Sequence, residues 1–282
     1  MEEAYARCKT LARTHYENFT VGSWFLPRDT RKYFYSVYAF CRSVDDLGDE
    51  YPGDRMRALD IWQREITRCY NGNPHHPYMV ALQDTIREFD IPIDPFLKLV
   101  QANRMDQTTN RFATFAELDH YCQHSATPVG HLVLYVSGYR DEHRQTLSDY
   151  TCTALQLVNF WQDVCRDFAM GRIYIPLEDM ARFGYTEDEL SRGVVNNAFR
   201  ALMEFETERA RDLFNKGLAL VDTLDGQLKI DVALFSQGGM KVLDAIERQG
   251  YDVLSRRPTL SRAAKVRLML STTLRLKLLG RP

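Results

Sequence analysis

The sequence predicts an all-α protein, a single helix bundle of residues 1–282 around a central apolar cavity. Three observations support this prediction. Apolar residues recur at helical spacing through most of the chain. No repeat, low-complexity tract or glycine/serine linker divides the chain, so one domain is the simplest account. Two otherwise apolar stretches also carry oxygen-bearing side chains at helical spacing, which would place polar groups at the mouth of a cavity.

The composition is that of an ordinary globular protein, with 45% hydrophobic and 26% charged residues. The net charge of −2 gives no general basic field, so we expect no nucleic-acid partner. The first residues lack the apolar core of a secretory signal, and no apolar run is long enough to span a membrane. Six cysteines without a CxxC pair are typical of reduced thiols, so we expect a cytoplasmic protein.

The stretch 33–50 is the first of the two stretches. Most of it is apolar or aromatic, which indicates a buried helix, but it ends in four acids, namely Asp45, Asp46, Asp49 and Glu50. Asp45 and Asp49 are one turn apart and share a face. Like charges at this spacing repel, and acids at a helix C-terminus oppose its dipole. A divalent cation would remove both penalties, and Mg²⁺ prefers carboxylate oxygens combined with substrate phosphates.

The same face continues toward the start of this stretch. Steps of three and four residues join aromatic, guanidinium and acidic side chains into one stripe, formed by Tyr35, Tyr38, Arg42, Asp45 and Asp49. The alternative is a core helix whose solvated end is acidic, because acid pairs at helical spacing are common.

A second stripe lies within residues 154–167, again in strongly apolar surroundings. Steps of three and four residues place two amides and two acids on one face, formed by Gln156, Asn159, Asp163 and Asp167. The sequence 171–176 then ends the helix and returns the chain in an extended form. Two such stripes are hard to explain as solvated surface. Facing one another, they would form a cavity with acids at its mouth and apolar side chains below.

Periodicity and turn residues predict the remaining elements. Capping boxes fit Thr114–Glu117 and Thr186–Glu189, and a proline and a glycine interrupt the pattern at 127–130. The paired His75 and His76 lack metal-site spacing, so we expect both in solvent. Helices are predicted over residues 3–19, 33–50, 55–70, 78–89, 94–110, 115–125, around 154–167, and over 196–224, 228–250 and 261–279.

The acids outside the two stripes are expected in solvent, including Glu204, Glu206 and Glu208 of a charge-mixed helix. Gly238 and Gly239 lie inside a predicted helix, where neither favours its stability. The last helix, 261–279, is basic and amphipathic. We interpret it as a core helix with a solvated basic face, and the alternative is a helix at a membrane interface.

With both stripes defined, the chain resembles the squalene/phytoene synthase family of trans-isoprenyl diphosphate synthases over nearly its whole length. Residues 38–49 resemble the DDxxD-type motif of that family, 156–167 resemble its DxxxD-type motif, and 171–176 resemble the segment after it. Within the family, residues 15–19 and 159–163 are most similar to the bacterial hopanoid-pathway branch of hydroxysqualene and squalene synthases. The resemblance implies an isoprenoid synthase bundle, which agrees with the helical pattern.

The resemblance also implies a site. The Mg²⁺ ligands would be Asp45, Asp46, Asp49, Asn159, Asp163 and Asp167. The catalytic residues would be Tyr38, Asp45, Asp49, Asp163 and Asp167. The substrate-binding residues would be His15, Asn18, Phe19, Tyr38, Arg42, Gln156, Gln162, Arg172 and Tyr174. The two arginines would clamp phosphate oxygens, and rings such as those of Tyr38 and Phe19 would stabilise a carbocation.

For this branch the resemblance implies conversion of presqualene diphosphate to hydroxysqualene, in which diphosphate leaves, the cyclopropane rearranges and water captures the cation. NADPH is not expected, because Gly239 stands where many family members carry tyrosine and Gln162 where several carry arginine.

Three alternatives stay open at this point. One is a squalene synthase that couples two farnesyl diphosphates with NADPH, and another is a presqualene diphosphate or phytoene synthase. The third is a non-catalytic assembly or lipid-binding protein of the same fold, although such proteins tend to lose acids that are intact here. The expected partners are a prenyl diphosphate substrate, other enzymes of the pathway and the inner face of the membrane, where product would leave.

Overall fold

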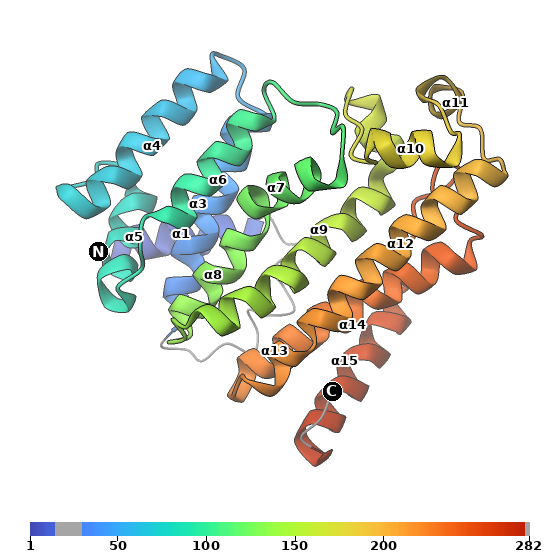
Figure 1. Cartoon of the computed structure of the whole chain (residues 1–282). Coiled ribbons are helices and arrows are strands. Elements are labelled where there is room, and N and C mark those ends of the chain that lie inside the picture. The colour runs from blue at the N-terminus through green and yellow to red at the C-terminus, as the bar shows by residue number, and fades with distance from the viewer. Residues whose placement is uncertain (15–29, 280–282) are drawn as a thin grey trace. The chain divides into compact units, whose positions relative to one another are not determined.

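The structure is a computed structural model that describes residues 1–14 and 30–279 (Figure 1). Within these two ranges the regular elements are helices and no strand occurs, so the predicted all-α fold is confirmed. The helices are α1 (Glu2–Thr14), α3 (Arg31–Asp49), α4 (Arg55–Asn71), α5 (Pro77–Phe89), α6 (Asp94–Met105), α7 (Phe115–Ser125), α8 (Thr127–Val136), α9 (Glu142–Ala169), α10 (Leu177–Phe183), α11 (Glu187–Ser191), α12 (Asn197–Gly217), α13 (Ala219–Asp222), α14 (Gly226–Arg248) and α15 (Arg262–Leu279).

Packing divides the chain into two compact units. The first comprises residues 1–108 and 123–145 and contains α1, α3, α4, α5, α6 and α8. The second comprises residues 109–122 and 146–282 and contains most of α7 and α9 together with α10 to α15. The single domain and its central cavity stay predictions.

The core of the first unit is built around α3. Phe40 of α3 is fully buried, stacks on Trp62 of α4 with ring centroids 6.1 Å apart, and meets Phe96 of α6 edge-on at 5.0 Å. Tyr5 of α1 donates a hydrogen bond from its hydroxyl to Asp84 of α5 at 2.8 Å. These neighbours fix α3, and therefore the direction in which its acidic end projects.

A buried glutamate fastens the loop between α4 and α5. Glu65 accepts the backbone N–H of His75 at 2.7 Å and of His76 at 3.0 Å, and Arg68 donates to it at 2.5 Å. Burial raises the pKa of Glu65, but these donors outweigh burial and lower the pKa to about 2. His75 is exposed as predicted, whereas His76 caps α5 and packs against Trp62, so the prediction was wrong for His76.

The second unit buries an acid that the sequence pattern had assigned to solvent. Glu206 of α12 is fully buried, while Glu204 and Glu208 are exposed as predicted. Arg209 donates to Glu206 at 2.8 Å and to the buried Asp179 of α10 at 2.8 Å. Burial raises the pKa of Glu206 to about 8, with Arg209 opposing this shift and Asp179 adding to it. The prediction failed because Arg209, one turn away, partly offsets the desolvation cost of burying the Glu206 carboxyl group.

Gly239 allows α14 to approach α12 closely. A Cβ atom at Gly239 would lie 2.2 Å from Cζ of Phe214, a fully buried ring of α12. At the adjacent Gly238 a Cβ atom would meet only Leu268, at 4.0 Å. Packing therefore requires glycine at position 239 and not at position 238.

Gly239→Ala is expected to destabilise the protein by about 1–3 kcal/mol, because the new methyl group displaces the Phe214 ring from a close-packed core. Gly238→Ala is the matched control, and we expect it to stabilise the helix by up to about 1 kcal/mol. Urea unfolding followed by circular dichroism measures both changes. Equal effects of the two substitutions would contradict the contact with Phe214.

Glu65→Gln is expected to cost about 2–3 kcal/mol at neutral pH, because the folded pKa lies well below that of an unfolded glutamate. A lowered pKa stabilises the fold above the unfolded value of 4.5, and this stability is lost as the pH falls from 4.5 toward 2. The stability difference between wild type and variant should therefore shrink over that interval in urea unfolding. Glu3→Gln, at a side chain that is 80% exposed, is the control and should show no such difference.

Candidate active site

The acids at the end of α3 lie on its accessible side. Asp45 and Asp49 are exposed, whereas Val44 and Gly48 beside them are buried. Tyr35, which the sequence pattern placed on the same stripe, is buried among residues of α1 and α5. The stripe therefore begins in the core and reaches solvent at the acids.

Asn103 of α6 positions Asp45. Its side-chain amide donates to Asp45 Oδ1 at 3.3 Å and to the carbonyl of Leu99 at 3.2 Å, and the side chain is 6% exposed. Gly48 makes this approach feasible, because a Cβ atom there would lie 2.0 Å from Asn103 Oδ1. Gln107 adds a hydrogen bond to the Gly48 carbonyl at 3.0 Å. The missing side chain of Gly48 thus leaves room for the Asn103 amide to reach the Asp45 carboxylate.

The pKa of Asp45 is raised to about 6. The main cause is partial desolvation of the carboxylate by surrounding protein atoms, although water still reaches it. The hydrogen bond from Asn103 opposes this shift, and the negative charge of Asp49 adds to it. A cation bound beside Asp45 would favour its ionised form.

Arg42 lies close to acids of its own helix. It pairs with Asp46 at 2.5 Å and with Glu50 at 3.1 Å. Arg42, predicted as a phosphate clamp, and Asp46, predicted as a metal ligand, are therefore each other's partners in this structure. The side chain of Tyr38, one turn earlier, is half-buried, and burial raises its pKa.

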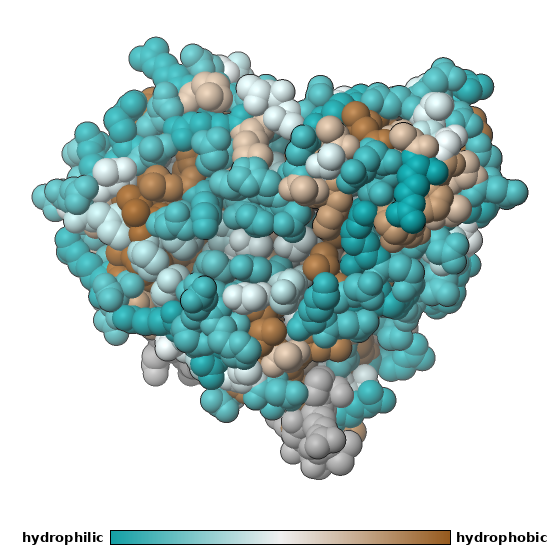
Figure 2. Space-filling model, viewed as in Figure 1, coloured by the Kyte–Doolittle hydropathy of each residue, from teal (hydrophilic) through white to brown (hydrophobic). Residues whose placement is uncertain are grey.

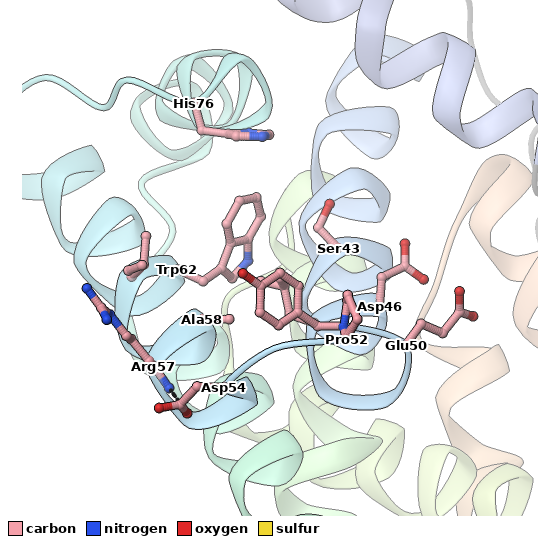
Figure 3. Close-up of a pocket in the computed structure, with 12 residues that line it drawn as sticks. Ser43, Asp46, Glu50, Pro52, Asp54, Arg57, Ala58, Trp62 and His76 are labelled. Atoms are coloured by element: carbon pink, nitrogen blue, oxygen red, sulfur yellow. Dashed lines mark hydrogen bonds between the residues drawn. The ribbon is translucent and has the colours of Figure 1, made fainter.

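A hollow of about 900 Å³ adjoins the end of α3 but is not centred on the exposed acids (Figure 3). Asp46 and Glu50 border it from α3, Trp62 borders it from α4, and neither Asp45 nor Asp49 is among its lining residues. The volume alone would make this hollow the first choice for a ligand. The exposed carboxylates of Asp45 and Asp49, which suit a metal ion, lie instead on the neighbouring face of α3.

The second stripe also reaches solvent. On α9, Asn159 is exposed and Gln156, Asp163 and Asp167 are partly exposed, whereas Phe160 and Val164 between them are buried. The apolar side of α9 therefore holds the helix in its unit, and the amides and acids occupy the accessible side, as the spacing predicts.

Arg257 holds Asp163 in a two-point ion pair that the sequence pattern did not reveal. Its Nε and Nη2 atoms donate to the two carboxylate oxygens of Asp163, each at 2.7 Å. Arg166 donates to the same carboxylate at 3.3 Å. Burial raises the pKa of Asp163, but Arg257 and then Arg166 outweigh it, so the pKa lies below its usual range.

Asp167 behaves in the opposite way. Burial and the charge of Asp163 raise its pKa to about 7, and the charges of Arg172, Arg166 and Arg257 only partly oppose this shift. Arg257 thus neutralises the Asp163 carboxylate, whereas the Asp167 carboxylate has an unusually high affinity for protons. A divalent cation would replace the proton on Asp167.

Two of the predicted substrate-binding residues are used in packing. Gln162 is buried, and its amide donates to the carbonyl of Pro258 at 2.6 Å, next to Arg257. Tyr174 is buried, with its ring stacked on that of Phe160 at 3.8 Å. Tyr174 also lines a hollow of only about 10 Å³, together with Asp167 and Arg172, which has room for about one water molecule.

Three predicted substrate-binding residues, His15, Asn18 and Phe19, lie outside the described residues. Among the residues that the structure describes, no three His, Cys, Asp or Glu side chains are grouped to hold a metal on their own. The donor set nevertheless suits Mg²⁺, which takes oxygen ligands and commonly combines one or two carboxylates with water and phosphate. Acids with raised pKa values beside arginines fit a site that receives a metal and a polyanion together.

The comparisons with known proteins identify the family of this chain. The sequence model of the family described as "Squalene/phytoene synthase" matches residues 12–264. A relative named 15-cis-phytoene synthase from Synechococcus elongatus is 32% identical, over 91% of this chain and 88% of its own length. Another 15-cis-phytoene synthase, from Synechocystis, is 34% identical, over 91% of this chain and 80% of its own length.

Two solved structures extend the comparison. A crystal structure titled squalene synthase HpnC, from Alicyclobacillus acidocaldarius, is 46% identical with a TM-score of 0.86, over 88% of this chain and 95% of its own. A dehydrosqualene synthase in complex with ligand is 25% identical with a TM-score of 0.88, over 98% and 97% of the two chains. The predicted family is thereby confirmed, and the chain belongs to the squalene/phytoene synthase family of isoprenoid synthases.

Proposed function

We propose that this enzyme is a Mg²⁺-dependent terpenoid synthase that converts presqualene diphosphate to hydroxysqualene and releases diphosphate. The observation that carries the proposal is the charge arrangement at the end of α9. Two carboxylates there lie next to Arg166, Arg172 and Arg257, so cation-binding and anion-binding groups occur together. A diphosphate with its magnesium ions needs both kinds of group.

The choice of substrate rests on likeness within the family. The solved squalene synthase HpnC is 46% identical to this chain, compared with 32% and 34% for the two phytoene synthases named above. This difference supports a substrate of the squalene branch. The phytoene synthases keep a second candidate open, in which the same acids serve a phytoene synthase reaction.

In the proposed reaction, diphosphate departs with the electron pair of its carbon–oxygen bond and leaves a carbocation. Bound Mg²⁺ would supply positive charge to the departing diphosphate. Asp45 and Asp49 of α3 and Asn159, Asp163 and Asp167 of α9 would be its ligands, and Arg172 and Arg257 would bind phosphate oxygens. The ring of Tyr38 would face the cation. Water then adds to the rearranged cation and loses a proton, which gives the alcohol.

Each rival reaction predicts a different product. A squalene synthase would need NADPH and would yield squalene, a presqualene diphosphate synthase would stop at a diphosphate, and a phytoene synthase would yield phytoene. A non-catalytic lipid-binding or assembly protein would release no diphosphate from any of these substrates. Substrate, cofactor and product together therefore distinguish these four rivals from the proposed reaction.

The pure protein, incubated with presqualene diphosphate and Mg²⁺ without nicotinamide, should release one diphosphate per C30 alcohol. Chelation of the metal should stop turnover. Mass spectrometry of the extract identifies the product, and a phosphate assay after treatment with pyrophosphatase counts the diphosphate. Appearance of squalene only with NADPH, or of phytoene from another prenyl diphosphate, would overturn the proposed reaction.

Asp45→Asn and Asp163→Asn test the metal ligands in the same assay. Each should lower turnover by about a hundredfold or more, because transition-state charge loses a preorganised partner. Far-ultraviolet circular dichroism should stay unchanged. Asp94→Asn, at an exposed acid of α6 that pairs with Lys98, is the control and should keep full activity. Full activity of either site variant would refute its role as a ligand.

Gly48→Ala should lower both turnover and stability, because the new Cβ atom displaces the Asn103 amide from Asp45. In an Asn103→Ala background the same substitution should cost much less, since the colliding Oδ1 atom is gone. A double-mutant cycle in urea unfolding and in turnover measures this coupling. Strict additivity of the two substitutions would show that Gly48 does not act through Asn103.

A further inference from the structure

A tight turn joins two residues of the candidate site in the second unit. Asp167 lies in the last turn of α9, and Arg172 follows the end of that helix. The Arg172 backbone N–H donates to the Asp167 carbonyl at 2.8 Å, and the Gly171 N–H donates to the Phe168 carbonyl at 2.9 Å. These two bonds form a Schellman motif, in which Gly171 takes the left-handed conformation, with φ at 81°. The turn therefore sets the spacing between a proposed metal ligand and a proposed phosphate-binding residue.

Arg111 holds this turn from a segment outside α9. Its Nη1 atom donates to the Gly171 carbonyl at 2.7 Å and to the Asn110 carbonyl at 2.8 Å. The backbone of the same segment pairs with the chain beyond the turn, where the Ile173 N–H donates to the Asn110 carbonyl at 2.9 Å. The Arg111 side chain extends this pairing to Gly171, the residue immediately before Arg172.

Glu187 orients the guanidinium of Arg111. The Nε atom of Arg111 donates to both carboxylate oxygens of Glu187 at 3.2 Å, and Nη2 donates to Oε2 at 3.1 Å. Glu187 is the first residue of α11, a helix whose start is fixed by a capping box at Thr186. The planar guanidinium is thus held by a carboxylate through two of its nitrogens and by two carbonyls through the third. A lysine has no such fork of donors.

The alternative interpretation is an ordinary surface ion pair. The side chains of Arg111 and Glu187 are 28% and 46% exposed, and hydrophilic residues cover most of the molecular face shown in Figure 2. Isolated ion pairs on such a surface contribute little to stability. The hydrogen bond to the Gly171 carbonyl distinguishes this pair, because it connects the ion pair to the backbone of the turn.

We propose that Arg111 is a positioning residue, which holds the turn so that Arg172 can bind the diphosphate of the substrate. Arg111 and Glu187 act on the backbone of the turn, and the turn carries Arg172. Residues that orient a binding group in this way commonly change affinity or activity by about 10–100-fold. The inference rests on the proposed function, in which Arg172 binds phosphate oxygens.

Isothermal titration calorimetry with inorganic diphosphate and Mg²⁺ tests this role without turnover. Arg111→Gln and Arg172→Gln should each weaken binding by about tenfold. The double variant should bind little more weakly than either single variant, because Arg111 acts through Arg172. Arg192→Gln is the matched control, at an exposed arginine of α11 that pairs with Asp188, and should bind as wild type does.

Two further variants separate position from charge. Arg111→Lys keeps the positive charge but loses the fork of donors, so it should also weaken diphosphate binding. Glu187→Gln removes a negative charge, which would strengthen anion binding if only the electrostatic field mattered. Because this substitution releases Arg111, we expect it to weaken binding several-fold. Glu187→Gln also provides the test if Arg111→Gln melts below the temperature of the measurement.

Additive losses in Arg111→Gln/Arg172→Gln would overturn the proposal, since Arg111 would then act independently of Arg172. Unchanged binding by Arg111→Gln, or stronger binding by Glu187→Gln, would overturn it as well. Unchanged binding by Arg172→Gln, or no diphosphate binding by the wild type, would instead refute the phosphate site of the proposed function and this inference with it.

Discussion

Repulsion between carboxylates held one turn apart is the interaction on which the candidate site depends. Apolar residues on the other sides of α3 and α9 fix these helices, so each helix keeps its acids one turn apart. The two helices relieve the repulsion differently. On α9 arginines neutralise Asp163, while Asp167 keeps a raised pKa; on α3 the Asn103 amide supports Asp45, while Arg42 pairs with Asp46.

The glycines of the chain show how packing serves chemistry. Gly48 lies inside the acidic motif, where its missing side chain lets an amide of α6 reach a carboxylate of α3. Gly239 lies far along the sequence, where it lets α14 approach the buried Phe214 ring of α12. Neither glycine needs an unusual backbone conformation, since both lie within helices and serve close approach.

Sequence periodicity predicted most of the helices and the two stripes, because each depends on spacing within one element, and the resemblance of the two motifs predicted the family. The helices α8, α10 and α11 were not predicted, and the range 196–224, predicted as one helix, contains α12 and α13. It could not predict Arg257, since 94 positions separate this residue from Asp163 and no local pattern marks it. Nor did it identify the packing roles of Gln162 and Tyr174. The burial of Glu206 was foreseeable in part, because it falls on the same helical face as Phe199, Leu202 and Ala210, but its partner Asp179 lies on another helix. Local spacing carried no information on such pairs.

If Asp163 binds the metal as proposed, its bidentate contact with Arg257 implies a thermodynamic linkage between metal and anion. Both carboxylate oxygens accept from the guanidinium, so a metal ion arriving alone has to compete with a cation already in place. An anion that binds Arg257 would reduce this competition and so raise the affinity for the metal. By reciprocity, bound metal would raise the affinity for the anion by the same factor. At the proposed metal site, such a contact would disfavour a metal ion alone and an anion alone, and would favour the two binding together.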